Sequence, residues 1–567
     1  MNFYHPPTDD MHFVLTRVLG AHQALQHLPA FAEVDEPLMQ QVLIEAGKFV
    51  GEVVAPLQRV GDETGACWHE GAVTMPPGFR QAYQAFWQAG WPGLSARTED
   101  GGQGLPGVLE AMLYEMLSGA NHGWTMAPGL LRGAYECILH HASDELKSLY
   151  LAKIATGEWL ATMCLTEPHA GSDLGLATTR AVPIGDGRHA LSGTKIFISG
   201  GEHDLTDNIV HLVLARLPDA PPGPKGLSLF LVPKFYPDGT RSAVHCDRIE
   251  EKMGLHGSPT CVMRFDAAAS WLVGEPGRGL QAMFVMMNAA RLHVALQGIG
   301  LLDAAWQKAH AYAQERRQMR APGRAGSSEA ADRIAEHPAI ARVLDTQRAW
   351  VDAGRVLAYQ TAIELDRIRH GSPEEQAFAH TWCALVTPIM KSAFTHQAFH
   401  GGSDCLQVLG GHGYVREWGI EQIVRDARVA MIYEGTNEIQ AIDLLVRKVL
   451  SDDGQRLGRV LDRVQSDQPV QRSASHARIA TLRAVTRQIV EAAPRDAQLP
   501  YRVAEDFLRA CALVLMEWAW WRIDAAVDLE QPLAAERWQA PSRALRQWVL
   551  PEFQMRTYII VHQCTAA

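Results

Sequence analysis

The sequence predicts an α+β protein in which helical segments stand before and after a stretch of short strands. From the start to about residue 160, apolar side chains recur at helical spacing, as in Met11, Val14 and Leu15. Between 161 and 265 the apolar residues alternate with polar ones in short runs, divided by Gly, Pro, Asp and Asn clusters. From Leu280 the helical spacing returns and continues into the C-terminal part of the chain. Strands grouped together between helical segments are typical of the α+β class.

Length and composition narrow the function classes. A chain of 567 residues is too long for one hydrophobic core, so we expect roughly three or four domains. An apolar fraction of 47% with 20% charged residues is ordinary for a globular protein. The net charge of −11 disfavours nucleic acid as the main partner.

The cysteines and the N-terminus predict a cytoplasmic protein. The nine cysteines form no CxxC pair and their number is odd, which favours reduced thiols over a disulfide framework or a zinc site. The opening residues MNFYHPP have neither the basic nor the apolar segment of a secretion signal. No apolar run reaches the length of a membrane span, so we expect none.

Individual elements follow from the same spacing. Five runs without intervening helices predict a compact antiparallel barrel or sandwich: 161–165, 195–198, 209–214, 227–232 and 261–265. The later helices are expected at 343–365, 378–409 and 507–527. The polar, glycine-containing run 321–328 predicts an exposed loop, and 465–469 predicts a linker.

One acidic residue stands in an unusual setting. Glu434 follows the apolar residues Met431, Ile432 and Tyr433 and precedes Gly435. Poor solvation makes a carboxylate a better proton acceptor near neutral pH, and glycine allows a ligand to approach the backbone closely. A surface glutamate at a helix end is an equally good interpretation of this stretch alone.

Four further motifs bear on ligand binding. CLTEPHAGSD at 164–173 places small residues and a hydroxyl directly after a strand, where backbone N–H groups can meet a carbonyl-rich or anionic ligand. The others are GTKIFISG at 193–200, MGLHGSPT at 253–260 and QVLGGHGY at 407–414. No GxGxxG follows a predicted strand, so a Rossmann dinucleotide site is not expected. Each motif alone could be a plain strand, turn or loop.

Taken together and in this order, the motifs resemble those of the acyl-CoA dehydrogenase family of flavoproteins. The resemblance covers roughly 35–450, with a weaker match to an extended bacterial branch at both ends. It implies an N-terminal α-helical domain at 1–160, a central antiparallel β-barrel at 161–272, a C-terminal helical bundle with the catalytic base at 273–455 and an additional helical domain at 470–567.

The resemblance implies FAD as the cofactor and assigns residues to it. Thr166 would bond the flavin ring, Phe197 would pack over it, and Ser199 would lie near its N5 atom. Many relatives have Trp and Thr at those last two positions, and Phe-Gly where this chain has Met319 and Arg320. The implied FAD-binding residues are Met163, Leu165, Thr166, Gly171, Ser172, Phe197, Ile198, Ser199, Arg316, Gln318, Gln407, Gly410, Gly411, Thr436 and Glu438.

The substrate-binding residues implied in the same way are Ser172, Arg291 and Gly435. An alternative for Arg291 is a buried arginine that packs its helix. His412 is interpreted as a loop residue, although a proton shuttle is conceivable at that position.

The implied reaction is the α,β-dehydrogenation of an acyl-CoA thioester to the trans-2-enoyl-CoA. Glu434 would remove the α-proton, and flavin N5 would accept the β-hydride. The substrate implied is a short-chain acyl-CoA or 3-methylthiopropanoyl-CoA. The alternatives are a medium- or long-chain dehydrogenase, an acyl-CoA oxidase, and a non-catalytic flavoprotein that shares the fold.

The resemblance also implies partners. An electron-transfer flavoprotein would accept the electrons, and the chain would form a homo-oligomer, most simply a dimer, because the segments of Arg316 and Gln407 serve the neighbouring subunit's FAD in the family. Relatives linked to DNA repair carry a basic C-terminal domain, whereas 451–567 has no lysine and nearly balanced charge. Nucleic acid is therefore not expected as a partner.

Overall fold

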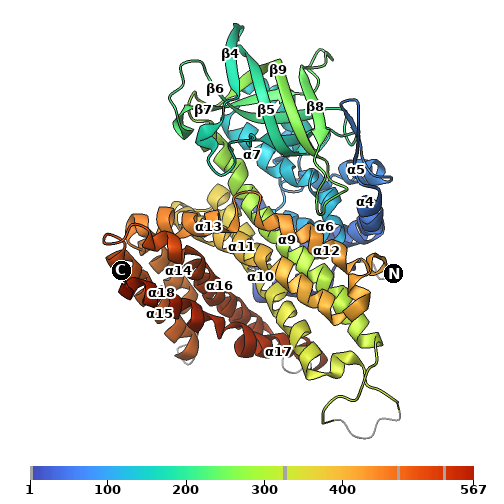
Figure 1. The fold of residues 1–567 in the computed structure, drawn as a ribbon, viewed down its shortest axis with the longest axis vertical. Coiled ribbons are helices and arrows are strands. Elements are labelled where there is room, and N and C mark those ends of the chain that lie inside the picture. The colour runs from blue at the N-terminus through green and yellow to red at the C-terminus, as the bar shows by residue number, and fades with distance from the viewer. Residues whose placement is uncertain (1–3, 324–328, 469–472, 528–531, 567) are drawn as a thin grey trace. The chain divides into compact units, whose positions relative to one another are not determined.

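The computed structural model describes residues 4–323, 329–468, 473–527 and 532–566. The chain forms two compact units (Figure 1). Unit 1 comprises 1–48, 107–120 and 294–567, and unit 2 comprises 49–106 and 121–293. The chain therefore enters unit 1 three times, and each unit is described by itself.

Unit 2 contains the β-sheet together with short helices. Its helices are α4 (Gln58–Thr64), α5 (Phe79–Gln88), α7 (Leu131–His141) and α8 (Asp144–Ala155). A small hairpin consists of β1 (Cys67–His69) and β2 (Ala72–Thr74). The large sheet consists of β3 (Leu160–Cys164), β4 (Arg180–Gly185), β5 (Arg188–Ser199), β6 (Ile209–Arg216), β7 (Leu227–Pro233), β8 (Val244–Ile249) and β9 (Thr260–Val273).

The pairings of the large sheet close into a ring. Strand β6 pairs β4, β4 pairs β5, β5 pairs β9, β9 pairs β7, and β7 returns to β6. Strands β3 and β8 attach to β6 and β9. All these pairs are antiparallel except β3 with β6 and the single β4–β6 pair. A closed ring has no exposed strand edge, and this fits the predicted antiparallel barrel.

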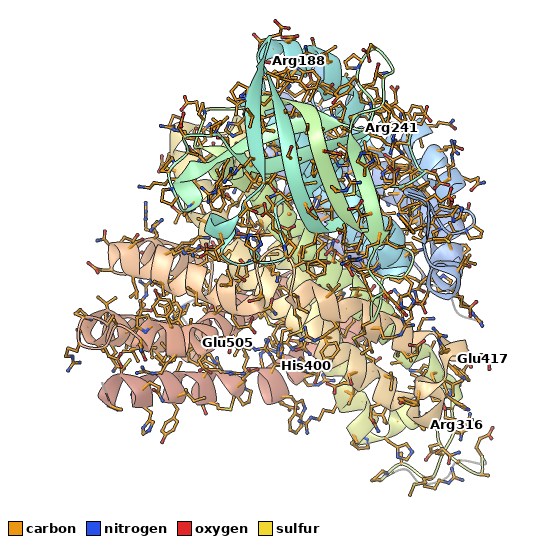
Figure 2. The ribbon with its side chains drawn as sticks, turned by 45° about the horizontal axis from the view of Figure 1, so that its top comes forward. Arg188, Arg241, Arg316, His400, Glu417 and Glu505 are labelled. Carbon is orange, nitrogen blue, oxygen red and sulfur yellow. The ribbon has the colours of Figure 1, made fainter. Side chains whose placement is uncertain are left out.

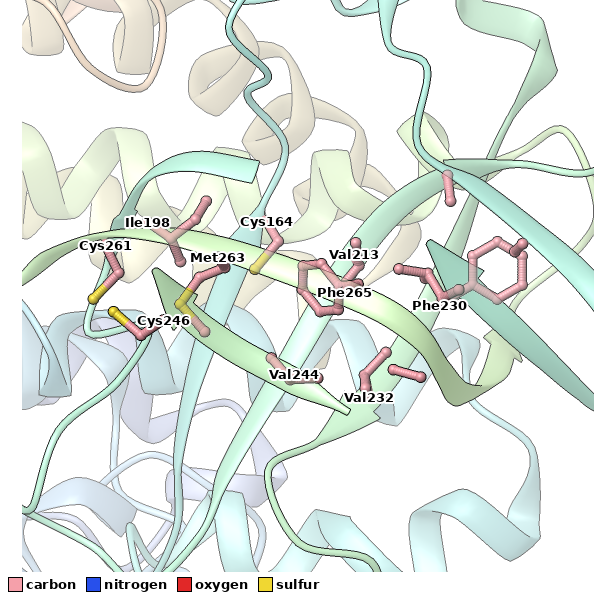
Figure 3. Packing of buried hydrophobic residues seen from close by; sticks show 14 of the residues in the cluster. Cys164, Ile198, Val213, Phe230, Val232, Val244, Cys246, Cys261, Met263 and Phe265 are labelled. Atoms are coloured by element: carbon pink, nitrogen blue, oxygen red, sulfur yellow. The ribbon is translucent and has the colours of Figure 1, made fainter. Parts of the chain in front are cut away.

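Alternating residues of these strands fill the interior of the barrel (Figure 3). Val213 and Phe230 face each other across β6 and β7 and are fully buried. Cys164, Cys246 and Cys261 contribute small apolar side chains to the same core. Cysteine behaves here as a compact apolar residue, in keeping with the absence of a disulfide: all nine cysteines are free thiols.

Unit 1 is helical. Its early helices are α1 (Thr8–Phe13), α2 (Ala21–Gln26), α3 (Glu36–Phe49) and α6 (Gly107–Thr125). The long helices are α9 (Gly279–Glu315), which begins in unit 2, α10 (Pro338–His370) and α11 (Pro373–Val408). The remaining helices are α12 (Ile420–Arg428), α13 (Asn437–Ile442), α14 (Gln455–Ser466), α15 (Ser473–Ala492), α16 (Leu499–Ala526), α17 (Pro532–Ala544) and α18 (Glu552–Ala566).

Glycines let the three long helices of unit 1 pack closely. A Cβ atom on Gly298 of α9 would meet the Phe394 carbonyl oxygen of α11 at 2.7 Å. One on Gly354 of α10 would meet Ile299 at 2.8 Å and Phe394 at 2.9 Å. The backbones therefore approach more closely than any larger residue would allow, which places α11 firmly against α9 and α10.

Helix α11 contains a proline whose effect is compensated. Pro388 has no N–H to donate to the carbonyl of Ala384, four residues earlier. Lys448 donates its ammonium to that carbonyl at 2.7 Å and to Asp443 at 3.0 Å. The helix starts at a capping box formed by Ser372 and Glu375.

A buried charge network joins segments of unit 1 that are distant in sequence. Arg355, which is fully buried, donates a hydrogen bond to Glu115 of α6 at 2.6 Å and forms an ion pair with Asp303 of α9 at 3.0 Å. Arg537 of α17 donates to Asp352 at 2.9 Å and to Asp10 of α1 at 2.9 Å. The charge network comprises Asp10, Glu115, Asp303, Arg348, Asp352, Arg355 and Arg537.

The structure confirms the predicted fold class and the predicted strands. Strands β4 and β8 and the hairpin β1–β2 were not predicted. Of the predicted loop 321–328, residues 324–328 lie outside the described parts of the chain. Of the predicted linker 465–469, residues 465 and 466 end helix α14, and residue 469 lies outside the described parts. Among the described residues, no helix is both long and apolar enough to cross a membrane.

Candidate functional site

The predicted site residues fall into two groups, one in each unit. Unit 2 contains the residues from Met163 to Ser199 together with Arg291, and unit 1 contains Glu434 and the residues around it, with the segments of Arg316 and Gln407. The two groups are built in different ways, one on strand ends and one on helix ends.

In unit 2, a buried ion pair holds the loop that follows β3. Lys195 of β5 is fully buried, and its ammonium donates to the Leu165 carbonyl at 2.9 Å and to the Glu167 carboxylate at 2.8 Å. Glu167 also accepts hydrogen bonds from the backbone and hydroxyl groups of Thr178 and Thr179 at 2.6–3.0 Å. Burial raises the pKa of Glu167, but Lys195 and these donors lower it further, to about 2.

This ion pair fixes Leu165 and Thr166 beside β5. The Ile196 N–H donates to the Thr166 carbonyl at 2.9 Å, which joins the segment after β3 directly to β5. The side chain of Thr166 remains only half-buried. The predicted residues Leu165, Thr166, Phe197, Ile198 and Ser199 are therefore brought together by the structure.

A β-bulge presents Phe197 to solvent. The register of β5 against β9 shifts between Lys195 and Ile198, and Phe197 has a φ of +59°. Its ring is 61% exposed, whereas Ile198 points into the barrel core. A β-bulge changes the direction of a side chain, and here it turns the Phe197 ring away from the barrel core, where a ligand could pack against it.

The open loop after Glu167 provides room for a ligand. A Cβ atom on Gly171 would meet nothing within 4 Å, and Ser172 is exposed next to it. Met163 is half-buried on β3. A flat aromatic face, a half-buried hydroxyl and open backbone groups together fit a planar heterocycle with a polar edge, such as a flavin. Arg291 of α9, the other residue predicted to bind substrate in unit 2, is buried, with 7% of its surface exposed.

In unit 1, Glu434 lies on a turn with left-handed backbone. Its φ is +55° and that of Gly435 is +81°. The turn joins the short helix Val429–Met431 to α13, whose N-cap is Thr436. A non-glycine residue in this conformation is strained by about 1–2 kcal/mol, and such strain persists only where the surroundings fix it.

Buried polar groups hold the two carbonyls of this turn. The side-chain amide of Gln440 donates to the Glu434 carbonyl at 2.8 Å, and the ammonium of Lys391 donates to the Gly435 carbonyl at 2.8 Å. Lys391 and Gln440 are both fully buried. Sequence analysis missed both residues, and nothing in the local sequence around Lys391 indicates the contact, because the two segments are 44 residues apart.

The residues next to Glu434 are also fixed. Tyr433 donates its hydroxyl to Gln297 of α9 at 2.5 Å. Burial, and then the negative charge of Glu434, raises the pKa of the Tyr433 phenol. Glu438 is exposed, and its hydrogen bond with Thr436 lowers its pKa. The carboxylate of Glu434 therefore follows a rigid tyrosine and precedes a capped helix.

The segments of Arg316 and Gln407 lie together at one end of unit 1. Tyr312 of α9 bonds His412 at 3.0 Å, and the His412 ring stacks on Trp418. This cluster brings the end of α9 next to the loop that follows α11. Arg316, labelled in Figure 2, is exposed beyond the end of α9. The predicted residues Gln318, Gln407, Gly410 and Gly411 are exposed in the same two segments.

His412, interpreted from the sequence as a loop residue, lies in the short 3-10 helix Gly410–Tyr414 that follows α11. Its partners are the aromatic residues Tyr312 and Trp418.

Comparisons with known proteins agree with this architecture. Three family models match successive parts of the chain: "Acyl-CoA dehydrogenase, N-terminal domain" at 39–158, "Acyl-CoA dehydrogenase, middle domain" at 162–268 and "Acyl-CoA dehydrogenase, C-terminal domain" at 277–449. The middle-domain match begins within β3 and ends within β9, and the C-terminal match includes Glu434 and Lys391.

Two relatives match most of the chain. The 3-methylmercaptopropionyl-CoA dehydrogenase of Ruegeria pomeroyi is 42% identical over 466 residues, which are 81% of this chain and 79% of that protein. The broad-specificity linear acyl-CoA dehydrogenase FadE5 of Mycobacterium tuberculosis is 35% identical over 509 residues, which are 86% of this chain and 81% of that protein.

Solved structures share the fold over nearly the whole chain. An acyl-CoA dehydrogenase of Bacillus anthracis complexed with FAD has a TM-score of 0.77 and 22% identity, covering 94% of this chain and 89% of its own. ACDH-11 of Caenorhabditis elegans, in complex with C11-CoA, has a TM-score of 0.77 and 19% identity, and the match covers 96% of this chain and 92% of that chain. The family models and the relatives together show that the chain belongs to the acyl-CoA dehydrogenase family.

Proposed function

We propose that the protein oxidises an acyl-CoA thioester to the trans-2-enoyl-CoA with FAD as the cofactor and Glu434 as the catalytic base. The observation that carries this proposal is the turn at Glu434, whose left-handed backbone is fixed by buried donors within the region matched by the C-terminal family model. A carboxylate presented on a rigid, partly desolvated turn is suited to accept a proton from carbon.

The residues of unit 2 would hold the flavin. Phe197 offers a ring face, Thr166 and Ser199 offer hydroxyl groups, and the open loop at Gly171 and Ser172 leaves backbone groups accessible. When bound, the flavin supplies the hydride acceptor for the β-carbon of the substrate. The relative from Bacillus anthracis is a complex with FAD, which supports the same cofactor here.

The protein itself handles the proton and the charge that develops. Removal of the α-proton moves negative charge onto the thioester oxygen, so a donor must lie near that oxygen. The backbone N–H of Glu434 is suited to this role because the turn that carries it is immobilised. The electron pair of the α C–H bond becomes part of the new double bond, and the α-proton goes to the Glu434 carboxylate. The β-hydrogen leaves with its electron pair as a hydride, for which the flavin would be the acceptor.

The Glu434→Gln variant tests this proposal. Glutamine keeps the shape of the side chain but cannot accept the proton, so we expect bound FAD and acyl-CoA affinity to be retained while flavin reduction is lost. Anaerobic bleaching of the flavin with a panel of acyl-CoAs measures this directly. Reduction at the wild-type rate would show that another residue is the base.

For the substrate, we propose a short acyl chain, either 3-methylthiopropanoyl or its plain alkyl counterpart. The relative at 42% identity is named for the methylmercaptopropionyl thioester, and two further relatives are named butyryl-CoA dehydrogenases. Since a buried methylene contributes only about 0.8 kcal/mol, neighbours in a chain-length series should differ by less than about tenfold in kcat/KM. A maximum at palmitoyl-CoA rather than at butyryl- or methylmercaptopropionyl-CoA would contradict this substrate.

We further propose that the reaction takes place in the cytoplasm and that an electron-transfer flavoprotein reoxidises the enzyme. Free thiols at all nine cysteines support a reducing compartment. An electron-transferring flavoprotein of Acidaminococcus fermentans is a structural neighbour with a TM-score of 0.59 and 26% identity. Rapid turnover with oxygen alone would instead identify an oxidase.

A further inference from the structure

We propose that Lys391 is a positioning residue for catalysis, which with Gln440 locks the Glu434–Gly435 turn in its left-handed conformation. The inference rests on the proposed role of Glu434 as the base. It concerns residues on α11 and α13 that lie outside the predicted site.

The geometry of the contacts points to this role. The Lys391 ammonium donates to the Gly435 carbonyl at 2.8 Å, and the Gln440 amide donates to the Glu434 carbonyl at 2.8 Å and to the Gly435 carbonyl at 3.4 Å. Both carbonyls belong to residues with positive φ. The Gly435 carbonyl has two donors and the Glu434 carbonyl has one, and these bonds restrain rotation of the two peptide groups and so the φ and ψ angles beside them.

The donors are themselves immobilised. The Lys391 ammonium also donates to the Asn437 side-chain oxygen at 3.0 Å, and Thr395 donates to the same oxygen at 3.1 Å. The Asn437 amide donates to the Ser392 carbonyl at 3.2 Å. These bonds join Lys391, Ser392 and Thr395 of α11 to Asn437 at the start of α13, and the strained turn at Glu434 lies directly before that residue.

Burial of the Lys391 ammonium argues that its hydrogen bonds do more than stabilise the fold. Burial of a lysine with zero exposure carries a large desolvation cost, which an apolar residue of similar volume would avoid. A residue needed only for packing would therefore be apolar at this position. A buried ammonium that holds the strained carbonyls has the further effect of keeping Glu434 in one place.

Lys448 provides a matched control. Its ammonium also donates to a carbonyl of α11, that of Ala384, which Pro388 cannot serve. It differs in that this carbonyl belongs to the helix and not to the turn at Glu434, and in that Lys448 also pairs with the Asp443 carboxylate at 3.0 Å. Replacement of either lysine by methionine removes a mostly buried ammonium that contributes to the contacts of α11 and keeps a side chain of similar length.

The test compares Lys391→Met, Gln440→Met, Lys448→Met and Glu434→Gln with the wild-type holoenzyme. We expect single-turnover flavin reduction by butyryl-CoA to fall about 100-fold in Lys391→Met, because displacement of a reacting group by about 1 Å has that effect, while FAD content and KM change less than about threefold. Lys448→Met should lose thermal stability and keep the rate. A rate in Lys391→Met that matches Lys448→Met would overturn the inference.

A second readout isolates the proton transfer. An acyl-CoA with sulfur in place of the β-carbon can lose its α-proton but has no β-hydrogen to give, and its enolate beside the oxidised flavin absorbs at long wavelength. That absorption at saturating analogue should be lost in Lys391→Met and in Gln440→Met and retained in Lys448→Met. Retention in both former variants would overturn the inference. If Lys391→Met does not fold, Gln440→Met decides the question alone.

Failure of the inference is distinguishable from failure of the proposed function. If the wild type is not reduced by any acyl-CoA, or if Glu434→Gln is reduced at the wild-type rate, the function assigned to Glu434 is wrong. If Glu434→Gln is inactive while Lys391→Met and Gln440→Met stay within about threefold of wild type, only the positioning role is wrong.

Discussion

At the scale of single residues, backbone conformation limits what can stand next to Glu434. Gly435 has a φ of +81°, and a Cβ atom there would meet the Gln440 amide nitrogen at 2.9 Å. A substitution at this position therefore acts twice, through backbone strain and by displacing the donor that holds the Glu434 carbonyl.

We expect Gly435→Ala to lower the unfolding free energy by about 1–2 kcal/mol and flavin reduction by more than about tenfold. Gly239→Ala is the matched control, because Gly239 has a φ of +82° and open space around its Cβ position. Urea unfolding should show a loss of stability in Gly435→Ala that is at least as large as in Gly239→Ala, where backbone strain acts alone. Stopped-flow flavin reduction should be slowed only in Gly435→Ala, and equal rates would contradict the coupling to Gln440.

At the scale of elements, the ion pair between Glu167 and Lys195 joins the end of β3 to β5. The pKa of Glu167 is lowered to about 2, so its ionised form stabilises the fold at any pH above the carboxyl's ordinary value of 4.5. That contribution is lost as the pH falls from about 4.5 towards 2, since the unfolded chain then binds the proton first.

We expect Glu167→Gln to lower the unfolding free energy by roughly 2–3 kcal/mol at pH 7, and the difference from wild type to shrink as the pH falls from 5 to 3. Denaturant titrations across that range measure it. A loosened loop should also weaken FAD binding, which flavin release on dilution reports. A difference in stability that stays constant down to pH 3 would contradict the ion pair.

Sequence patterns predicted most elements but few of the contacts that fix the site. The helices α10 and α11 and the strands β6 and β7 have strong apolar periodicity, so their existence was predictable. Strand β4 was missed because its one buried residue is the small Ala181, while its larger apolar residues Val182 and Ile184 are exposed and flank a proline.

The site residues divide in the same way. Glu434 and Phe197 were found from their motifs, but their positive φ angles come from distant partners and have no local signal. Lys391 is one polar residue in a helix that is otherwise recognisable by its apolar residues, and only the folded structure shows that it contacts the turn. The division of the chain into four domains, and the roles of the individual site residues, stay predictions.

At the scale of the whole molecule, the charge network holds the C-terminal helices to the start of the chain. Burial raises the pKa of Asp10, but Arg348 and Arg537 lower it further, to about 2. Asp352 is fully buried and depends on Arg537 for two hydrogen bonds at 2.9 and 3.0 Å.

We expect Arg537→Met to lower the unfolding free energy by about 3 kcal/mol, because it leaves Asp352 buried with one cation fewer. The double variant Arg537→Met with Asp352→Leu should recover part of that loss, since the stranded charge is then absent. Thermal unfolding of both variants measures this. Equal stability of the single variant and the wild type would show that α17 contributes little.

The exposed segments of Arg316 and Gln407 lead to a prediction of assembly. These segments contain several arginines and the exposed apolar residues Met319, Tyr414 and Val415. Exposed apolar side chains of this kind are suited to contact with another protein surface. We expect the protein to be a dimer with FAD bound, measured by sedimentation velocity, and Arg316→Ala to lose FAD on dilution. A monomer with full FAD occupancy would contradict the assembly.

The discontinuity of unit 1 has a consequence for how a cell makes the protein. Asp10 leaves the ribosome long before Arg537, and at about 5–20 residues per second the delay is about 30 to 100 s. During that time the apolar residues Met11, Val14 and Leu15 have no completed core, although in the finished fold they are fully buried. Residues 49–106 and 121–293 can meanwhile form unit 2. We therefore expect the yield of active protein to rise when chaperones shield the nascent N-terminus or when faster translation shortens its exposure.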